Sequence, residues 1–211
     1  HHIMSEYINK LQREILPKIN NIQNINILEL GVQRGTSTNI FLKICENNDG
    51  YLTSVDIDDC SNVTKNKRWK FIHSRDDDFS VIKDKINKKI DVIYIDTLHE
   101  ADHVEKIIYG YYDLLKSGGY IFIDDISHLP YLSGEPRNNF YCEINNKETF
   151  DRIIDIYASN KKNFNLNFDF SSSGLATLQK KNENNLNPKK NIKERKFTLR
   201  NLLRKLKLTF K

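Results

Sequence analysis

Residues 27–38 read ILELGVQRGTST, which predicts the end of a buried strand, a loop bounded by two glycines and the start of a helix. Gly31 would let a ligand approach the backbone closely, and Gly35 permits the tight turn into a helix whose amino end points at that ligand. Glu29 is a carboxylate near the end of a buried strand, where it needs a partner; a cationic amino group on a ligand would be one. A strand-to-helix turn without a ligand is the alternative. A dinucleotide-binding turn is another, although its G-x-G-x-x-G pattern is absent.

Strands alternate with helices around this stretch, which predicts an α/β fold with a mostly parallel seven-stranded sheet and helices on both faces. The expected strands are 25–30, 51–56, 70–73, 91–96, 120–124, 163–170 and 174–179. The expected helices are 5–19, 37–47 capped by Ser37, 79–89, one from a capping box at 97–100 to Gly118-Gly119, and 147–159. The turn at 171–174 is too short for a crossover, so the last two strands pair antiparallel.

The length of 211 residues suits one domain with an ordinary core. We interpret residues 1–4 as the remnant of a purification tag, 5–180 as the folded domain and 181–211 as a basic tail. The net charge of +5 is unevenly spread, because Lys180 to Lys211 hold twelve Lys or Arg against two Glu. The tail is therefore strongly basic and the rest of the chain mildly acidic.

The sequence has three cysteines, an odd number, and they lack metal-ligand spacing. This pattern is typical of reduced thiols in a cytoplasm. The sequence shows no signal peptide and no apolar run of about 18 residues. We therefore expect a cytoplasmic protein without a membrane span.

Asp56 ends the second expected strand. A carboxylate at this place can accept hydrogen bonds from both hydroxyls of a ribose. Asp58 is the nearby alternative for this role, and a role in a turn or as a helix cap is the alternative for Asp56 itself.

Three aspartates follow the fourth and fifth expected strands, namely Asp96, Asp124 and Asp125. Neighbouring parallel strands bring them to the same rim of the sheet, where their charges repel one another. A hard divalent cation such as Mg²⁺ relieves that repulsion with oxygen ligands, and it could lower the pKa of a substrate hydroxyl. Roles as turn residues or helix caps are the alternative.

The order ILELGVQRGTST, TSVDID, DVIYID and LLKSGGYIFIDD resembles the Rossmann-fold (class I) S-adenosylmethionine-dependent methyltransferases, over roughly residues 20–180. The last strand pair is similar to the antiparallel hairpin that closes the sheet in that superfamily. The resemblance implies S-adenosyl-L-methionine as cofactor. The residues implied to hold it are Glu29, Gly31, Gly35, Thr36 and Ser37 for the methionine part, Asp56 for the ribose, Ser74 and Asp76 for the adenine, and Asp96.

The three aspartates also resemble the metal site of the O-methyltransferases of the catechol and macrolide-sugar types. There, one Asp after the fourth strand and an Asp-Asp or Asp-Asn pair after the fifth bind the metal. The stretch from Ile95 to His99 is particularly similar to the bacterial family of sugar O-methyltransferases and cephalosporin-hydroxylase-like proteins. The resemblance implies that His99 is the general base; a histidine that is only hydrogen-bonded to a carboxylate at a helix start is the alternative.

Residues 127–146 have no clear periodicity, and loops of this length are usually functional or disordered. His128 in this segment is a second candidate near the metal or substrate, whereas His103 and His73 are expected to be structural. The residues expected either to line an acceptor pocket or to staple a surface loop are Tyr131, Arg137, Phe140 and Tyr141.

The tail ends in residues 197–210, which interleave Phe and Leu with Arg and Lys. This pattern suits an amphipathic helix on an anionic membrane. A helix packed on the domain or on a sister subunit of a homo-oligomer is the alternative. We expect no nucleic-acid partner, because a tail without a folded groove is weak evidence for one.

The leading hypothesis is an O-methyltransferase that uses S-adenosylmethionine and a divalent metal to methylate a hydroxyl of a sugar, a glycan or another small molecule. One alternative is a hydroxylase-like or nucleotide-dependent enzyme on a similar fold. The other is a non-catalytic module that binds a cofactor or a partner.

Overall fold

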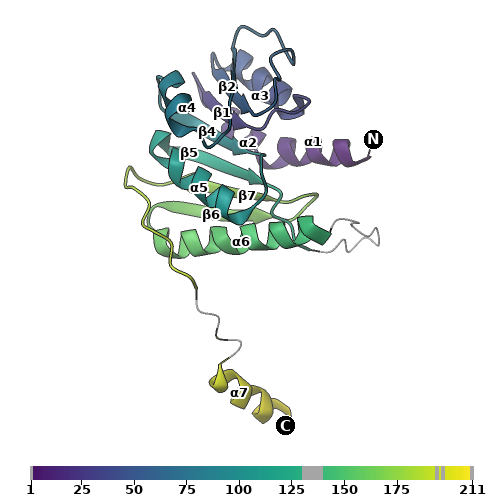
Figure 1. Cartoon of the computed structure of the whole chain (residues 1–211), viewed down its shortest axis with the longest axis vertical. Coiled ribbons are helices and arrows are strands. Elements are labelled where there is room, and N and C mark those ends of the chain that lie inside the picture. The colour runs from purple at the N-terminus through teal and green to yellow at the C-terminus, as the bar shows by residue number, and fades with distance from the viewer. Residues whose placement is uncertain (1, 130–139, 193–194, 196–197, 210–211) are drawn as a thin grey trace.

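The computed structural model describes residues 2–129, 140–192, 195 and 198–209. Within these residues seven strands form one sheet in the order β3-β2-β1-β4-β5-β7-β6 (Figure 1). The strands are β1 (Asn26–Leu30), β2 (Tyr51–Asp56), β3 (Trp69–His73), β4 (Ile90–Ile95), β5 (Leu115–Asp124), β6 (Phe164–Asp169) and β7 (Leu175–Lys180). The first five pair parallel, and β7 pairs antiparallel with both β5 and β6. The predicted α/β sheet with its antiparallel end is therefore confirmed.

Helices cover both faces of the sheet. They are α1 (His2–Glu14), α2 (Leu16–Ile19), α3 (Thr36–Asn47), α4 (Phe79–Lys85), α5 (Ala101–Tyr111), the 3₁₀ helix η1 (Tyr112–Leu114), α6 (Phe140–Asn160) and α7 (Leu199–Thr209). Successive strand residues point to opposite faces. Accordingly, Tyr94 of β4 packs in the cluster with α1 and α3, whereas Ile93 packs in the cluster with α4, α5 and α6.

The expected first helix is interrupted. Instead of one helix over 5–19, α1 ends at Glu14 and α2 begins at Leu16. Pro17 explains the break, because it has no backbone N–H to continue the hydrogen-bond ladder of α1. Leu11, Ile15 and Ile19 are nevertheless all buried, as their spacing predicts.

The predicted capping box at 97–100 is wrong. Helix α5 begins at Ala101 after Glu100, which makes no side-chain cap. The Thr97 hydroxyl instead donates to Asp76 Oδ2 over 2.7 Å. The Thr97 side chain therefore contacts a distant segment of the chain instead of capping the helix.

The end of the same helix also differs from the prediction. Helix α5 ends at Tyr111, and the pair Gly118-Gly119 lies inside β5. The register explains the length of β5: Ile90 pairs with Leu115, whereas Val92, two residues later, pairs with Tyr120. The extra residues of β5 form a bulge, which the positive φ of Gly118 allows.

The start of the basic tail packs on the domain. The backbone carbonyl of Asn187 accepts hydrogen bonds from the Tyr109 hydroxyl and the Asn160 side chain, and Ile192 N donates to Asp155. Helix α7 lies beyond this segment, apart from the sheet (Figure 1). In the part of the chain described here, no helix has the length and apolarity needed to cross a bilayer.

Candidate active site

The candidate site lies at the carboxyl ends of the parallel strands. Strand β1 has β2 on one side and β4 on the other, so the chain order of the strands reverses between β1 and β4. Ligands of doubly wound sheets bind at such a switch point. The residues that follow β1, β2, β4 and β5 meet at this edge.

The two glycines after β1 are required by packing. A Cβ atom on Gly31 would stand 2.0 Å from the backbone oxygen of Asp96, and one on Gly35 would stand 2.1 Å from Val63 Cγ1. Both glycines also have positive φ, 97° and 76°. Gly35 is the N-terminal flanking residue of α3, which has no side-chain cap. The loop therefore lies directly against the end of β4. Ser37 was predicted to cap α3, and this prediction is wrong.

Asp56 fixes the shape of this loop. Its Oδ2 accepts the backbone N–H groups of Val32 over 2.8 Å and Gln33 over 3.0 Å, and its Oδ1 accepts that of Asp58 over 2.9 Å. Partial burial would raise the pKa of Asp56, but the three amide donors outweigh it and hold the pKa below its ordinary value. The carboxylate is therefore ionised and rigidly placed beside the loop. Its contact with a ribose remains a prediction.

Glu29 has partners within the chain. Its side chain is fully buried and accepts hydrogen bonds from the hydroxyls of Ser37, Thr38 and Ser54, over 2.6, 2.8 and 2.6 Å. Burial raises the pKa of Glu29 to about 7, although the hydroxyls oppose the shift. Glu29 and Ser37 therefore join β1, β2 and α3, so the buried carboxylate has hydroxyl partners within the chain, and the contact of these two residues with a cofactor remains a prediction.

Thr36 is half-buried under α1, where its hydroxyl lies 3.7 Å from Met4 Sδ. Of the adenine candidates, Ser74 donates to Asp78 over 3.2 Å. Asp76 Oδ2 lies 2.8 Å from His103 Nε2 and accepts the Thr97 hydroxyl. Through its hydrogen bond with Thr97, Asp76 thus connects the loop after β3 to the residue that follows Asp96.

The structure separates Asp124 from the other two predicted metal ligands, Asp96 and Asp125. Asp124 is 1% exposed and its Oδ1 accepts the ammonium group of Lys10, from α1. The same carboxylate also accepts the hydroxyls of Ser173 and Tyr94, each over 2.9 Å, and the backbone N–H of Asp125 over 2.7 Å. Its oxygens are therefore occupied by groups of this chain.

Asp96, Asp125 and His99 form an accessible cluster, with side-chain exposures of 26%, 32% and 31%. His99 Nε2 lies 3.0 Å from Asp125 Oδ2 and 3.6 Å from Asp96 Oδ1. One ligand atom of each residue lies within 4.8 Å of the other two. Asp125 has φ 57°, an uncommon conformation for a residue other than glycine, and such conformations concentrate at functional sites.

Helix α1 supplies residues that the sequence analysis missed. The Tyr7 hydroxyl donates to Asp96 Oδ2 over 2.9 Å and lies 2.9 Å from the Tyr94 hydroxyl. Burial and the Asp124 carboxylate raise the pKa of Asp96. Burial and these two carboxylates keep the pKa of Tyr7 well above its ordinary value, so the phenol stays a donor. The available signal was the position of Tyr7 and Lys10 on the same helix face as Leu11.

The remaining histidines lie outside this cluster. His128 packs against Phe150 and Phe170, with ring centroids 5.0 and 5.9 Å away. His73 Nε2 lies 2.8 Å from the backbone oxygen of Ile57, in keeping with a structural role. The predicted acceptor-pocket residues Tyr131 and Arg137, and the side chains of Phe140 and Tyr141, lie outside the described residues.

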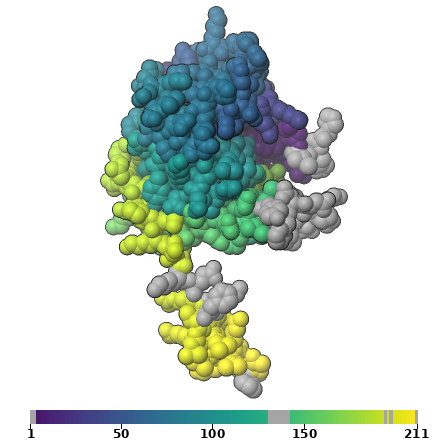
Figure 2. Space-filling view, viewed as in Figure 1, coloured from purple at the N-terminus to yellow at the C-terminus, as the bar shows by residue number. Residues whose placement is uncertain are grey.

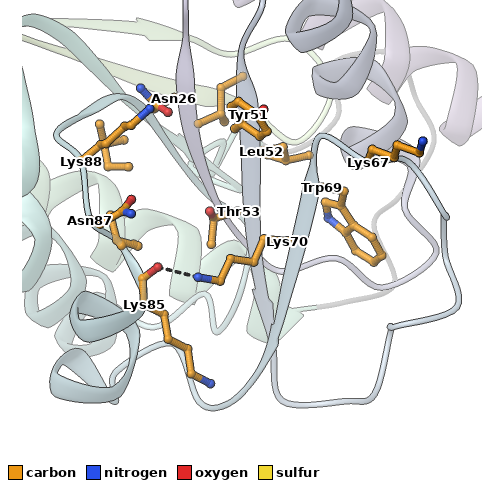
Figure 3. Close-up of a pocket in the computed structure, with 13 residues that line it drawn as sticks. Asn26, Tyr51, Leu52, Thr53, Lys67, Trp69, Lys70, Lys85, Asn87 and Lys88 are labelled. Atoms are coloured by element: carbon orange, nitrogen blue, oxygen red, sulfur yellow. Dashed lines mark hydrogen bonds between the residues drawn. The ribbon is translucent and has the colours of Figure 1, made fainter.

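A hollow of about 370 Å³ lies at the opposite edge of the sheet (Figure 3). Its lining includes Asn26, Tyr51 and Trp69, the first residues of β1, β2 and β3. Lys70 reaches from β3 to the backbone oxygen of Lys85 over 2.6 Å, as Figure 3 shows. Because this hollow faces the amino ends of the strands, it is separate from the candidate site.

Residues 28–126 match a family model described as a methyltransferase domain. They include the loop after β1, Asp56 and the cluster of Asp96, His99 and Asp125. The match covers 99 of the 211 residues. No curated protein matches the sequence.

Several solved structures share the fold of this chain. MycE, a methyltransferase of the mycinamycin biosynthetic pathway in complex with Mg and SAH, is 18% identical with a TM-score of 0.63, over 86% of this chain and 54% of its own. A Staphylococcus aureus protein, provisionally named a caffeoyl-CoA O-methyltransferase, is 20% identical with a TM-score of 0.59, over 85% of this chain and 83% of its own. A Clostridium thermocellum protein, provisionally named an rRNA methylase, is 14% identical with a TM-score of 0.61, over 86% and 97%. This chain spans about half the length of MycE.

The cluster of Asp96, His99 and Asp125 fits a divalent ion. Asp96 and Asp125 offer two accessible carboxylates at one point, and Mg²⁺ is usually bound by one or two carboxylates together with water and substrate oxygens. The Lys10 ammonium already neutralises Asp124, which leaves two negative charges without a cation from the described residues when His99 is neutral. The donor set and the charge balance therefore both suit one divalent ion.

Proposed function

We propose that the protein is a methyltransferase, which transfers a methyl group from S-adenosylmethionine to a hydroxyl of a sugar or another small molecule with the help of a divalent ion. The observation that carries the proposal is the accessible cluster of Asp96, His99 and Asp125 at the carboxyl edge of the sheet, beside the loop after β1. This is where doubly wound sheets bind their ligands.

Asp96 and Asp125 would hold the ion, which we take to be Mg²⁺. When bound, the ion would polarise the acceptor hydroxyl and make its proton more acidic. Tyr7 fixes Asp96 by a hydrogen bond to Oδ2, which leaves Oδ1 on the side of His99. Asp124 does not take part as a ligand in this proposal, because Lys10 holds it.

His99 would accept the acceptor's proton at Nδ1, the ring nitrogen that is unprotonated when Nε2 donates to Asp125. The hydroxyl oxygen then attacks the methyl carbon of the sulfonium group, a C–O bond forms, and the C–S bond breaks. The bonding pair passes to sulfur, so the leaving group is neutral S-adenosylhomocysteine and His99 carries the proton. Because Asp125 Oδ2 lies 3.0 Å from Nε2, it can accept the Nε2–H of the neutral imidazole, which orients the ring, and it can stabilise the protonated imidazole.

The small-molecule acceptor is supported by the fold neighbours. MycE has been solved with Mg, SAH and mycinamycin VI together, with 18% identity to this chain and a TM-score of 0.60. The identity is too low to transfer a substrate, so the acceptor class rests on the chemistry of the cluster, which suits an ionisable hydroxyl.

A methyl-transfer assay tests the proposal. The full chain is incubated with methyl-labelled donor and a panel of sugars, phenols and glycan precursors, with Mg²⁺ or with EDTA. We expect label in an alkali-stable ether product, lost with EDTA and restored by Mg²⁺. His99→Ala should lower turnover by about 10²–10⁴-fold. An alkali-labile ester product, or turnover indifferent to EDTA and to His99→Ala, would contradict the proposal.

A further inference from the structure

Helix α7 exposes an apolar stripe that the described domain does not cover. Leu199, Leu202, Leu203 and Leu206 are 71%, 55%, 52% and 48% exposed, and no residue of the helix is buried. Figure 2 shows this yellow segment as a lobe beside the compact body. An isolated helix of 11 residues is marginal in water, so this helix needs a surface to stabilise it.

The helix has two chemically different sides. The four leucines recur at i, i+3, i+4 and i+7, which places them on one side. The basic residues of the helix lie off that stripe: they are Arg200, Arg204, Lys205 and Lys207. The helix contains no acidic residue. A surface that covers it must therefore combine an apolar layer with negative charge.

A shallow hollow beside the helix is lined by basic side chains. Its lining includes Arg195, Arg200, Arg204 and Lys207. Guanidinium groups bind phosphate oxygens in pairs of parallel hydrogen bonds, and they do so better than an ammonium group. The anionic component of the covering surface is therefore best matched by phosphate.

The other exposed large apolar side chains of the described residues come from several elements. Tyr51 lies at the amino edge of the sheet, Val81 on α4, Ile144 on α6 and Ile192 in the tail, whereas Met4, Ile57, Leu98 and Leu129 lie on α1 and on the loops that follow β2, β4 and β5. Single exposed apolar residues of this kind are ordinary features of a soluble surface. Among the described residues they form no row at helical spacing that resembles the leucine stripe of α7.

We propose that α7 is a membrane-surface anchor, which inserts its leucine stripe into a bilayer rich in anionic phospholipid and places its Arg and Lys side chains among the headgroup phosphates. An acyl layer under a phosphate layer supplies both properties that the helix demands. Attraction between the basic residues and the lipid charge would make the binding sensitive to salt.

Vesicle co-sedimentation of the full chain tests this inference. We expect the chain to bind vesicles of phosphatidylcholine with about 30% phosphatidylglycerol, and to bind them at least tenfold more weakly at 0.5 M salt, by screening of the charges. Vesicles of pure phosphatidylcholine should bind at least tenfold more weakly as well. Equal binding to both vesicle types, or binding to neither, would overturn the proposal.

Matched variants separate the stripe from general hydrophobicity. Leu202→Gln with Leu206→Gln should lower binding at least tenfold. Leu208→Gln is the control, because Leu208 is 57% exposed but lies two positions from Leu206, off the stripe. Equal loss in both variants would overturn the stripe as the inserted surface. A chain that sediments as a dimer without vesicles and becomes a monomer in the double variant would assign the stripe to a second copy and overturn the proposal.

Discussion

Lys10 and Asp124 form a buried ion pair that joins the first helix to the end of strand β5, across 114 residues of sequence. Each side chain is 1% exposed. The Lys10 ammonium also donates to Ser173 Oγ over 2.6 Å and to the backbone oxygen of Gly174 over 3.2 Å, so it has three acceptors. The pair fastens α1 over the carboxyl edge of the sheet and supplies a fixed positive charge to one of three clustered carboxylates.

Removing the ammonium group should destabilise the fold strongly. Lys10→Met leaves Asp124 buried without its counter-ion, and breaking a buried pair in this way costs about 3–5 kcal/mol. Urea unfolding followed by circular dichroism measures the loss. The control is Lys147→Met, whose exposed pair with Asp151 should contribute less than about 1 kcal/mol. Adding Asp124→Leu to Lys10→Met should recover much of the stability; equal losses for Lys10→Met and Lys147→Met would refute the buried pair.

Two adjacent aspartates should differ in their effect on ion binding. Asp125→Ala should lower the affinity for Mn²⁺, measured by electron paramagnetic resonance, at least tenfold, because it removes an accessible carboxylate of the cluster. Asp124→Asn should change that affinity less than about threefold, because the Asp124 oxygens already have partners within the chain. Asp124→Asn also removes the counter-ion of Lys10 and so destabilises the fold. The affinities for Mn²⁺ are therefore compared for the folded fraction of each variant. Equal loss in both variants would place Asp124 among the ligands instead.

A methyl group on Gly31 should disrupt the site. Gly31→Ala adds a Cβ that meets the backbone oxygen of Asp96 at 2.0 Å, in addition to the strain of a positive φ. Gly118→Ala provides the matched control, because Gly118 also has positive φ, +83°, but open space around it. We expect a loss of about 1 kcal/mol for Gly118→Ala, from backbone strain alone, and a clearly larger loss for Gly31→Ala. Thermal unfolding compares them, and similar losses would show that the loop is not packed against β4.

The stability of the fold should depend on the protonation of Glu29. Its pKa rises from an ordinary 4.5 to about 7, so the folded state binds the proton more tightly than the unfolded state does. The stabilisation is complete below pH 4.5 and is lost as the pH rises to about 7, on the order of 3 kcal/mol in all. Glu29→Gln should remove this dependence. Unfolding free energies of both proteins between pH 4.5 and 8 should therefore diverge, and parallel curves would exclude the shift.

Most of the sheet could be predicted, because the residue patterns that indicate a strand lie within the strand and at its end. Strands β1 and β2 are short apolar runs that end at a glycine and an aspartate, and their predicted bounds agree within one residue. The start of β5 could not be predicted. Its first residues pair irregularly with β4, and the pair Gly118-Gly119 looked like a helix end because a bulge and a helix end both favour glycine.

The site could be predicted only in part. The strand-end aspartates and His99 were found because parallel strands bring their carboxyl ends together. The role of Lys10 could not be foreseen, because lysine is almost never fully buried unless paired, and its partner lies far away in sequence. The three hydroxyl partners of Glu29 could not be foreseen either, because they come from two other elements, α3 and β2, whose packing the sequence does not specify.

The proposed function depends on the binding of S-adenosylhomocysteine at the carboxyl edge of the sheet. Calorimetric titration of the full chain should give a saturable one-to-one heat. Asp56→Ala, which releases the loop at Val32 and Gln33, should weaken that binding at least tenfold, whereas Asp59→Ala, at an exposed position nearby, should leave it unchanged. No saturable heat in the wild-type chain, or equal binding by the Asp56 variant, would contradict the assigned donor site.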